Sequence, residues 1–211
     1  MRAFNELIYR YDQLASEYAK RFCRELEGKP FDRSLLQRFV TALPGGTVCD
    51  LGCGPGHVAA YVKNLGADVM GVDLSPAMVI EARRRYRSIA FRVGNMLDLK
   101  MEAGSLGGIV ALYSIIHLER NMIQQAFREM HRVLRPGGRL LVSFHEGTGE
   151  LHEDHVFDTQ VSFDCTLFEP NEVTHAMAAA GFSVAEVTVR PPYAFEYPTQ
   201  RAYILAEAAR G

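Results

Sequence analysis

The chain has 211 residues, of which 48% are hydrophobic and 23% charged. This size and balance are typical of one globular domain, and they exclude a fibrous or a disordered chain. The formal net charge is -2, so no overall field favours a nucleic acid or an anionic membrane surface. Apolar runs stay well below the ~18 residues of a membrane span, and the N-terminus does not read as a secretory signal. We therefore expect a cytoplasmic protein with neither membrane nor nucleic-acid partners.

Two helices are expected before residue 45. From Asn5 to Glu27, leucine and aromatic side chains recur at helical spacing, and the pattern stops at Gly28-Lys29-Pro30. A second helix is expected from about Asp32, as its N-cap, to Leu43. Residues 1–44 are thus predicted to form a helical segment in front of the main domain.

Residues 45–145 alternate short apolar runs with helical segments. The runs are TVCDL, ADVMGVD, IAFRV, GGIVALYSI and GRLLVSF, with helices expected near 57–65, 76–86 and 121–134. Nearly continuous apolar strands separated by amphipathic helices predict a parallel sheet that is covered on both faces. The predicted fold class is α/β, a Rossmann-like doubly wound sheet.

After residue 145 the alternation of apolar runs and helical segments stops, and it resumes at residue 170. Residues 146–169 are irregular, and we interpret them as an insertion over the functional site. Residues 170–211 predict a short helix that ends at Gly181, followed by the strands FSVAEVTV and RAYILAEA. The sheet is therefore expected to be mostly parallel with an antiparallel last strand, and the whole chain to form a single domain.

The segment VCDLGCGPGHVAAYV runs from a strand through a glycine-rich turn into a helix. Gly52, Gly54 and Gly56 allow backbone angles and a close ligand approach that a Cβ would block. A dinucleotide fingerprint needs a glycine where this chain has His57, and Pro55 removes an amide that would face a pyrophosphate. The turn is therefore a poor phosphate cradle.

Two carboxylates flank this turn in the predicted sheet. Asp73 ends the second strand, where an acid of an α/β fold meets the two hydroxyls of a ribose. Asp50 precedes the turn and would repel phosphate but attract an ammonium or sulfonium group. These residues describe a ligand with a ribose, a positive charge and no phosphate.

The chain resembles the class I S-adenosylmethionine-dependent methyltransferases, closely over Thr47 to Phe144 and loosely in the flanks. DLGCGPG is similar to that family's first motif and GVDLSPAMVIEAR to its second-strand region. VGNMLDL, YSIIHL and REMHRVLRPGGRLLVSF are similar to three later segments, in the family's order. The resemblance implies a single methyltransferase domain of the bacterial small-molecule kind, with residues 1–44 as a helical lid and 45–145 as the cofactor-binding core.

The resemblance also implies which residues contact S-adenosylmethionine and its product S-adenosylhomocysteine. Asp50, Gly52, Cys53 and Gly54 would line the methionine part, and Asp73 would hold the ribose. Leu74 and Met96 would flank the adenine, and the side-chain oxygen of Asn95 would accept from its amino group. Tyr113 or Ser114 would present a backbone carbonyl to the amino-acid end. Tyr11 and Tyr18 share one face of the front helix and would cover the cofactor, or equally serve as core residues there.

A sulfonium-bound methyl group is already electrophilic, so the protein needs mainly to align a nucleophile and exclude water. The attacking atom of the small-molecule acceptor, oxygen, nitrogen or sulfur, stays open. His117 follows the fourth strand and is the candidate general base, with a capping or packing histidine as the alternative. His145 and Tyr193 are candidate substrate-contacting residues.

Other chemistries are weaker matches. His145, Glu146, His152, Glu153, Asp154 and His155 are able to ligate a metal, but their spacing matches no defined zinc site, so we expect no metal there. Cys53 has no base placed beside it, and we expect free thiols at all four cysteines. The alternatives that remain are an NAD-dependent oxidoreductase and a non-catalytic module that binds S-adenosylmethionine. The oligomeric state is open.

Overall fold

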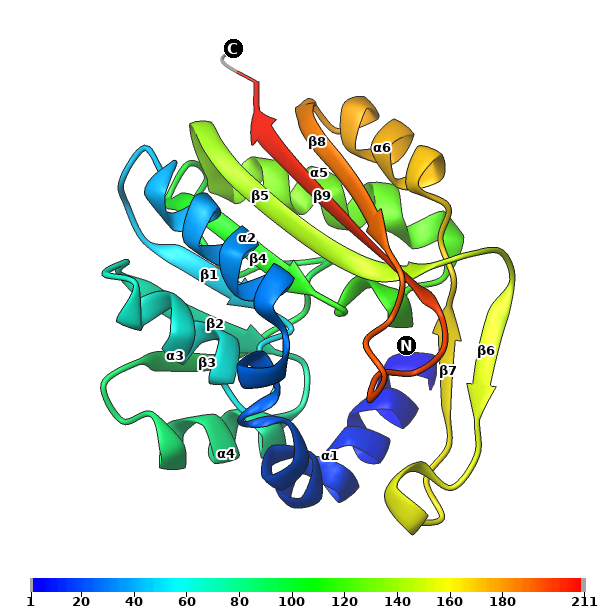
Figure 1. The fold of residues 1–211 in the computed structure, drawn as a ribbon. Coiled ribbons are helices and arrows are strands. Elements are labelled where there is room, and N and C mark those ends of the chain that lie inside the picture. The colour runs from blue at the N-terminus through cyan, green and yellow to red at the C-terminus, as the bar shows by residue number, and fades with distance from the viewer. Residues whose placement is uncertain (1, 210–211) are drawn as a thin grey trace.

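The computed structural model describes residues 2–209, with side chains from residue 4 onward except at 158. A seven-stranded sheet in the order β3-β2-β1-β4-β5-β9-β8 forms its centre (Figure 1). Its strands are β1 Val48–Leu51, β2 Val69–Asp73, β3 Ala90–Val93, β4 Leu106–Leu112, β5 Leu134–Glu146, β8 Phe182–Arg190 and β9 Gln200–Ala208. The strands β1 to β5 pair in parallel, whereas β9 lies antiparallel between β5 and β8. The predicted α/β sheet with an antiparallel last strand is confirmed.

Helices cover both faces of the sheet, as the apolar strands predict. One face packs against α2 (Pro30–Thr41), α3 (His57–Asn64) and α4 (Pro76–Arg85). The other face packs against α5 (Ile123–Val133) and α6 (Pro170–Ala179). In the described part of the chain, no helix is both long enough and apolar enough to cross a membrane.

The N-terminal helices differ from the prediction at their boundaries. The first, α1, covers Arg2–Phe22 and is followed by a separate 3-10 turn, η1, at Glu25–Gly28. The second helix begins at Pro30 rather than at an Asp32 N-cap. Proline suits the first helical position because its fixed φ is helical and its missing N–H has no partner there anyway. Asp32 instead turns inward and is only 2% exposed.

Residues 146–169 contain two strands that the sequence did not reveal. The strands β6 (Glu150–Glu153) and β7 (Phe163–Thr166) form an antiparallel hairpin beside α1 (Figure 1). The Phe163 ring lies 4.5 Å from the Tyr11 ring, and the Phe157 ring lies 6.0 Å from the Tyr18 ring. The hairpin therefore packs on α1 and supports that helix from outside.

Candidate active site

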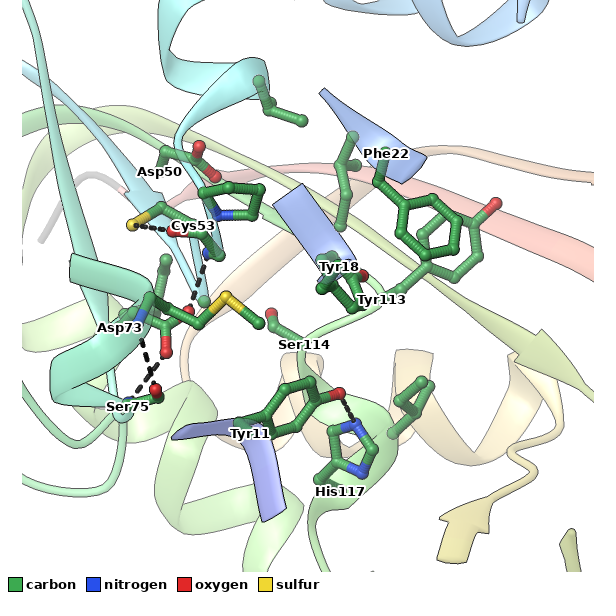
Figure 2. A pocket seen from close by; sticks show the side chains of 18 of the residues that line it. Tyr11, Tyr18, Phe22, Asp50, Cys53, Asp73, Ser75, Tyr113, Ser114 and His117 are labelled. Atoms are coloured by element: carbon green, nitrogen blue, oxygen red, sulfur yellow. Dashed lines mark hydrogen bonds between the residues drawn. The ribbon is translucent and has the colours of Figure 1, made fainter. Parts of the chain in front are cut away.

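A cavity of about 560 Å³ lies at the carboxyl ends of β1, β2 and β4, where ligands bind in open α/β sheets. Figure 2 shows Asp50, Cys53 and Asp73 on one side of this cavity and Tyr18 and Tyr113 on the other. The roof is formed by α1. Among the described residues, those of 146–169 do not line the cavity.

The glycine-rich turn fits tightly against the segment after β4. Gly52 has a φ of +75°, and a Cβ there would meet the Cβ of Ser114 at 2.3 Å. The backbone N–H groups of Gly52 and Cys53 donate to the Val72 carbonyl oxygen at 2.7 and 3.0 Å. A side chain at Gly52 would force the turn and the Ser114 segment apart, so only glycine keeps the cavity in this shape.

Asp73 is held by two backbone donors at the carboxyl end of β2. The Gly54 N–H donates to Asp73 Oδ2 at 2.7 Å, and the Ser75 N–H donates to Oδ1 at 2.8 Å. Burial raises the pKa of the Asp73 carboxyl to about 6, although these hydrogen bonds act in the opposite direction. Each carboxylate oxygen still has a lone pair for a ligand hydroxyl.

Asp50, which precedes the glycine-rich turn, is buried. It is 2% exposed, and its Oδ2 accepts from the Ala59 N–H at 2.8 Å. Burial raises the pKa of Asp50 to about 7, so its charge is only partly developed at neutral pH. It does line the cavity, next to the glycine-rich turn.

The segments after β2 and β3 also reach the cavity. Leu74, Asn95 and Met96 all line it. The side-chain oxygen of Asn95 already accepts from the Leu97 N–H at 2.9 Å. An adenine amino group would therefore have to share this oxygen, which has a second lone pair.

Tyr113 and Ser114 form the cavity wall after β4. Tyr113 has a φ of +52°, which is unusual for a side chain other than glycine, and its hydroxyl lies 3.0 Å from the Tyr203 hydroxyl. The buried Ser114 Oγ has no hydrogen-bond partner among the described residues. A buried hydroxyl without a partner is costly, which marks this position as one that a ligand would complete.

His117 lines the cavity but is already hydrogen-bonded to α1 and to the β6–β7 hairpin. Its Nδ1 lies 3.2 Å from the Asp164 carbonyl oxygen, which only accepts, so Nδ1 carries the hydrogen. Its Nε2 then accepts from the Tyr11 hydroxyl at 2.5 Å (Figure 2). Burial lowers the pKa of His117 to about 4, so the ring is neutral at pH 7.

The two expected substrate residues have different positions. His145 lines the cavity, its Nδ1 lies 2.7 Å from the Thr199 hydroxyl, and burial lowers its pKa to about 3. Tyr193 is not among the lining residues. Its hydroxyl accepts from the Phe31 N–H at 3.1 Å, so this side chain attaches the β8–β9 loop to α2. Phe195 and Tyr197 of the same loop reach the cavity instead.

All twelve residues expected at the cofactor line one cavity, together with His117 and His145. The charged lining residues that the sequence did not predict are Arg21, Glu25, Lys29, Asp32, His57, Glu196 and Arg201. These side chains come from distant segments that only the folded chain brings together. Their sole sequence signal is the Glu25 and Lys29 pair, spaced four apart before Pro30.

Comparisons with known proteins agree with this geometry. Residues 48–138 match the family model described as a methyltransferase domain. Methyltransferase GfsG of Streptomyces halstedii is 34% identical over 68% of this chain and 55% of its own length. A probable S-adenosylmethionine-dependent methyltransferase of Mycolicibacterium smegmatis is 31% identical over 71% of this chain and 57% of its own length. The chain thus spans little more than half the length of these relatives.

Solved structures share the fold. The crystal structure of an S-adenosylmethionine-dependent methyltransferase from Methanosarcina mazei superposes with a TM-score of 0.73 at 17% identity. The superposition covers 81% of this chain and 96% of that one. At this identity the likeness shows the fold alone.

Proposed function

The chain belongs to the class I S-adenosylmethionine-dependent methyltransferases, and from this membership we propose that it transfers a methyl group from S-adenosylmethionine to a small-molecule acceptor. The observation that carries the proposal is Asp73, held at the end of β2 by Gly54 and Ser75 and facing the same cavity as the glycine-rich turn. An acid in this position accepts from two ribose hydroxyls.

The residues present fit this cofactor. Asp73 offers acceptors to the ribose, Leu74 and Met96 offer apolar surface to the adenine, and the unpartnered Ser114 Oγ offers a hydroxyl. Asp50, Gly52, Cys53 and Gly54 form the wall for the methionine part. Burial also raises the pKa of the Cys53 thiol well above its usual range, which makes this side chain part of the wall rather than a nucleophile.

The bound cofactor supplies an electrophilic methyl group, and the protein's task is to position the acceptor and exclude water. Water is excluded by the helical lid: Tyr11 and Tyr18 close the cavity from above, and the β6–β7 hairpin supports them. We propose that His145, with Tyr197 and Phe195 rather than Tyr193, contacts the acceptor. A cavity roofed by a helix suits a small molecule better than a nucleic-acid strand.

We also propose that His117, which is unprotonated at pH 7 because burial lowers its pKa to about 4, takes the proton of an oxygen or nitrogen acceptor. Because its Nε2 accepts from Tyr11, the proton would pass from the acceptor to Tyr11 Oη as the Tyr11 proton moves to Nε2. The test is turnover of a His117→Ala variant with an acceptor found by screening. We expect turnover to fall by about 10²-fold or more, and unchanged turnover would leave catalysis to proximity alone.

Calorimetric titration with S-adenosylmethionine, S-adenosylhomocysteine and NAD tests the cofactor. We expect the first two to bind, NAD not to bind, and Asp73→Ala to weaken binding by about tenfold or more. Asp68→Ala is the matched control, because Asp68 lies exposed just before the opposite end of β2. Binding of NAD alone would overturn the proposal. Cofactor binding without methylation of any screened acceptor would assign a binding module instead.

A further inference from the structure

Three buried or half-buried polar side chains line the cavity next to the glycine-rich turn and have no role in the proposed function so far: Glu25, Lys29 and His57. Glu25 lies in η1, Lys29 directly precedes α2, and His57 is the first residue of α3. The side chains of Lys29 and His57 are each 8% exposed, and that of Glu25 is 19% exposed. Burying charge is costly, so charges at a cavity wall point to a role in binding.

Glu25 joins the other two side chains. Its Oε1 lies 2.7 Å from His57 Nε2, and its Oε2 lies 2.7 Å from Lys29 Nζ. Burial by itself raises the pKa of Glu25, but the hydrogen bonds and charges of His57 and Lys29 lower it to about 2. Glu25 is therefore a carboxylate at any physiological pH. Lys29 Nζ also lies 3.3 Å from a Glu196 oxygen, so this ammonium faces two carboxylates.

One ring nitrogen of His57 has no hydrogen-bond partner among the described residues. A carboxylate only accepts, so the Nε2 atom that faces Glu25 carries a hydrogen. The other ring nitrogen, Nδ1, is buried and has no hydrogen-bond partner among the described residues. An unpaired buried nitrogen costs free energy that a ligand group would recover. His57 lines the same cavity as Asp50 and the glycine-rich turn.

The order of the strands says which part of a ligand lies there. Adenine-side residues follow β2 and β3, at one edge of the sheet, whereas Lys29 Nζ lies 5.2 Å from the ring centre of Tyr113, which follows β4. A cofactor laid from β3 across β1 toward β4 places its amino-acid end beside Glu25, Lys29 and His57. That end carries an ammonium and a carboxylate, which match a wall holding acids and bases together.

We propose that Glu25, Lys29 and His57 recognise the charged amino-acid end of the cofactor. This inference rests on the proposed function and adds three residues to it. Because η1 joins α1 to α2, the contact also connects the cofactor to the segment that follows the lid. A ligand that lacks the amino-acid end would bind without making this contact.

The test compares two ligands that differ only at this end. S-adenosylhomocysteine has the amino-acid end, and 5′-methylthioadenosine replaces it with a methyl group. We expect Glu25→Gln and His57→Gln each to weaken S-adenosylhomocysteine about tenfold or more and to change 5′-methylthioadenosine less than about twofold. The ratio of the two dissociation constants, measured calorimetrically, is insensitive to a general loss of folded protein. Glu27→Gln is the matched control, since Glu27 is exposed in the same turn and pairs with Arg24.

Three results would decide the matter. The assignment is supported if the dissociation constant of S-adenosylhomocysteine, divided by that of 5′-methylthioadenosine, rises in both variants and stays constant in Glu27→Gln. A ratio that is unchanged in both variants, or equal losses of the two ligands, overturns it and leaves the cofactor assignment intact. If the wild-type protein binds neither adenosine compound, the proposed function itself fails.

Discussion

Asp73 keeps its proton to a higher pH than an ordinary aspartate, because burial raises its pKa to about 6. The ionised carboxylate accepts ribose hydroxyls more strongly than the protonated acid does. Affinity for S-adenosylhomocysteine should therefore increase as pH rises through about 6 and decrease as pH falls below it. We expect binding at pH 5 to be several-fold weaker than at pH 8.

Calorimetric titrations across this range measure the effect, with Asp73→Asn as the variant that cannot titrate. Asp50 has its pKa raised to about 7, so it contributes a slope of the same sign, and the variant should keep part of the pH dependence. An Asp73→Asn slope as steep as that of the wild type would contradict the assignment of this titration to Asp73.

The N-terminal helix α1 is attached to the core through two neighbouring residues, Tyr11 and Asp12, which contact different elements. Asp12 Oδ1 accepts from the Ser75 hydroxyl at 2.5 Å and from the Ala77 N–H at 3.0 Å, at the N-terminus of α4. Tyr11 bonds to His117 after β4. The helix thus bridges the cavity from the end of β2 to the end of β4.

Removing the Asp12 attachment should loosen α1 and leave the core folded. Asp12→Ala deletes an acceptor at a helix N-terminus, which costs about 1 kcal/mol. We expect faster amide hydrogen exchange within Arg2–Phe22 and little change in β1 and β4, as followed by mass spectrometry. Glu17→Ala serves as the control, because Glu17 makes only surface ion pairs on the same helix. Equal protection of α1 in both variants would rule out this attachment.

The β6–β7 hairpin shows why one element escaped prediction. Its strands are four residues long, and β6 reads Glu-Leu-His-Glu with mostly exposed side chains. An apolar face is what makes a strand visible in a sequence, and this hairpin buries mainly Phe163 and Thr166. Its position is decided by contacts with α1, which no local pattern encodes.

A buried network fastens the N-terminal helices to the last two strands of the sheet. The guanidinium of Arg190 donates to the Tyr203 hydroxyl at 2.7 Å and pairs with Asp32 at 3.1 Å and Glu196 at 2.7 Å. The Tyr203 hydroxyl in turn donates to Asp32 at 2.9 Å. The buried carboxylates of Asp32 and Glu196 are thereby neutralised by Arg190, although Asp32 lies far from it in the sequence.

Arg190→Met should destabilise the whole molecule, because it leaves Asp32 and Glu196 buried without their main cation. We expect a loss of about 3 to 5 kcal/mol in the free energy of unfolding, measured by urea denaturation. Arg139→Met is the comparison, since Arg139 pairs with Glu207 at 3.7 Å near the surface and should cost less than about 1 kcal/mol. Similar losses in the two variants would mean that the network adds little.

The sequence by itself determined the sheet core, the glycine-rich turn and the set of cavity-lining residues between Asp50 and Ser114. These features are local: an apolar run predicts a buried strand, and parallel strands bring their carboxyl ends to one edge. Only the tertiary structure decided what closes that edge. The ion pairs of Glu25, Lys29 and His57, the bond between Tyr11 and His117, and the turning away of Tyr193 join segments distant in sequence. Their geometry depends on packing and burial, which no spacing along the chain expresses.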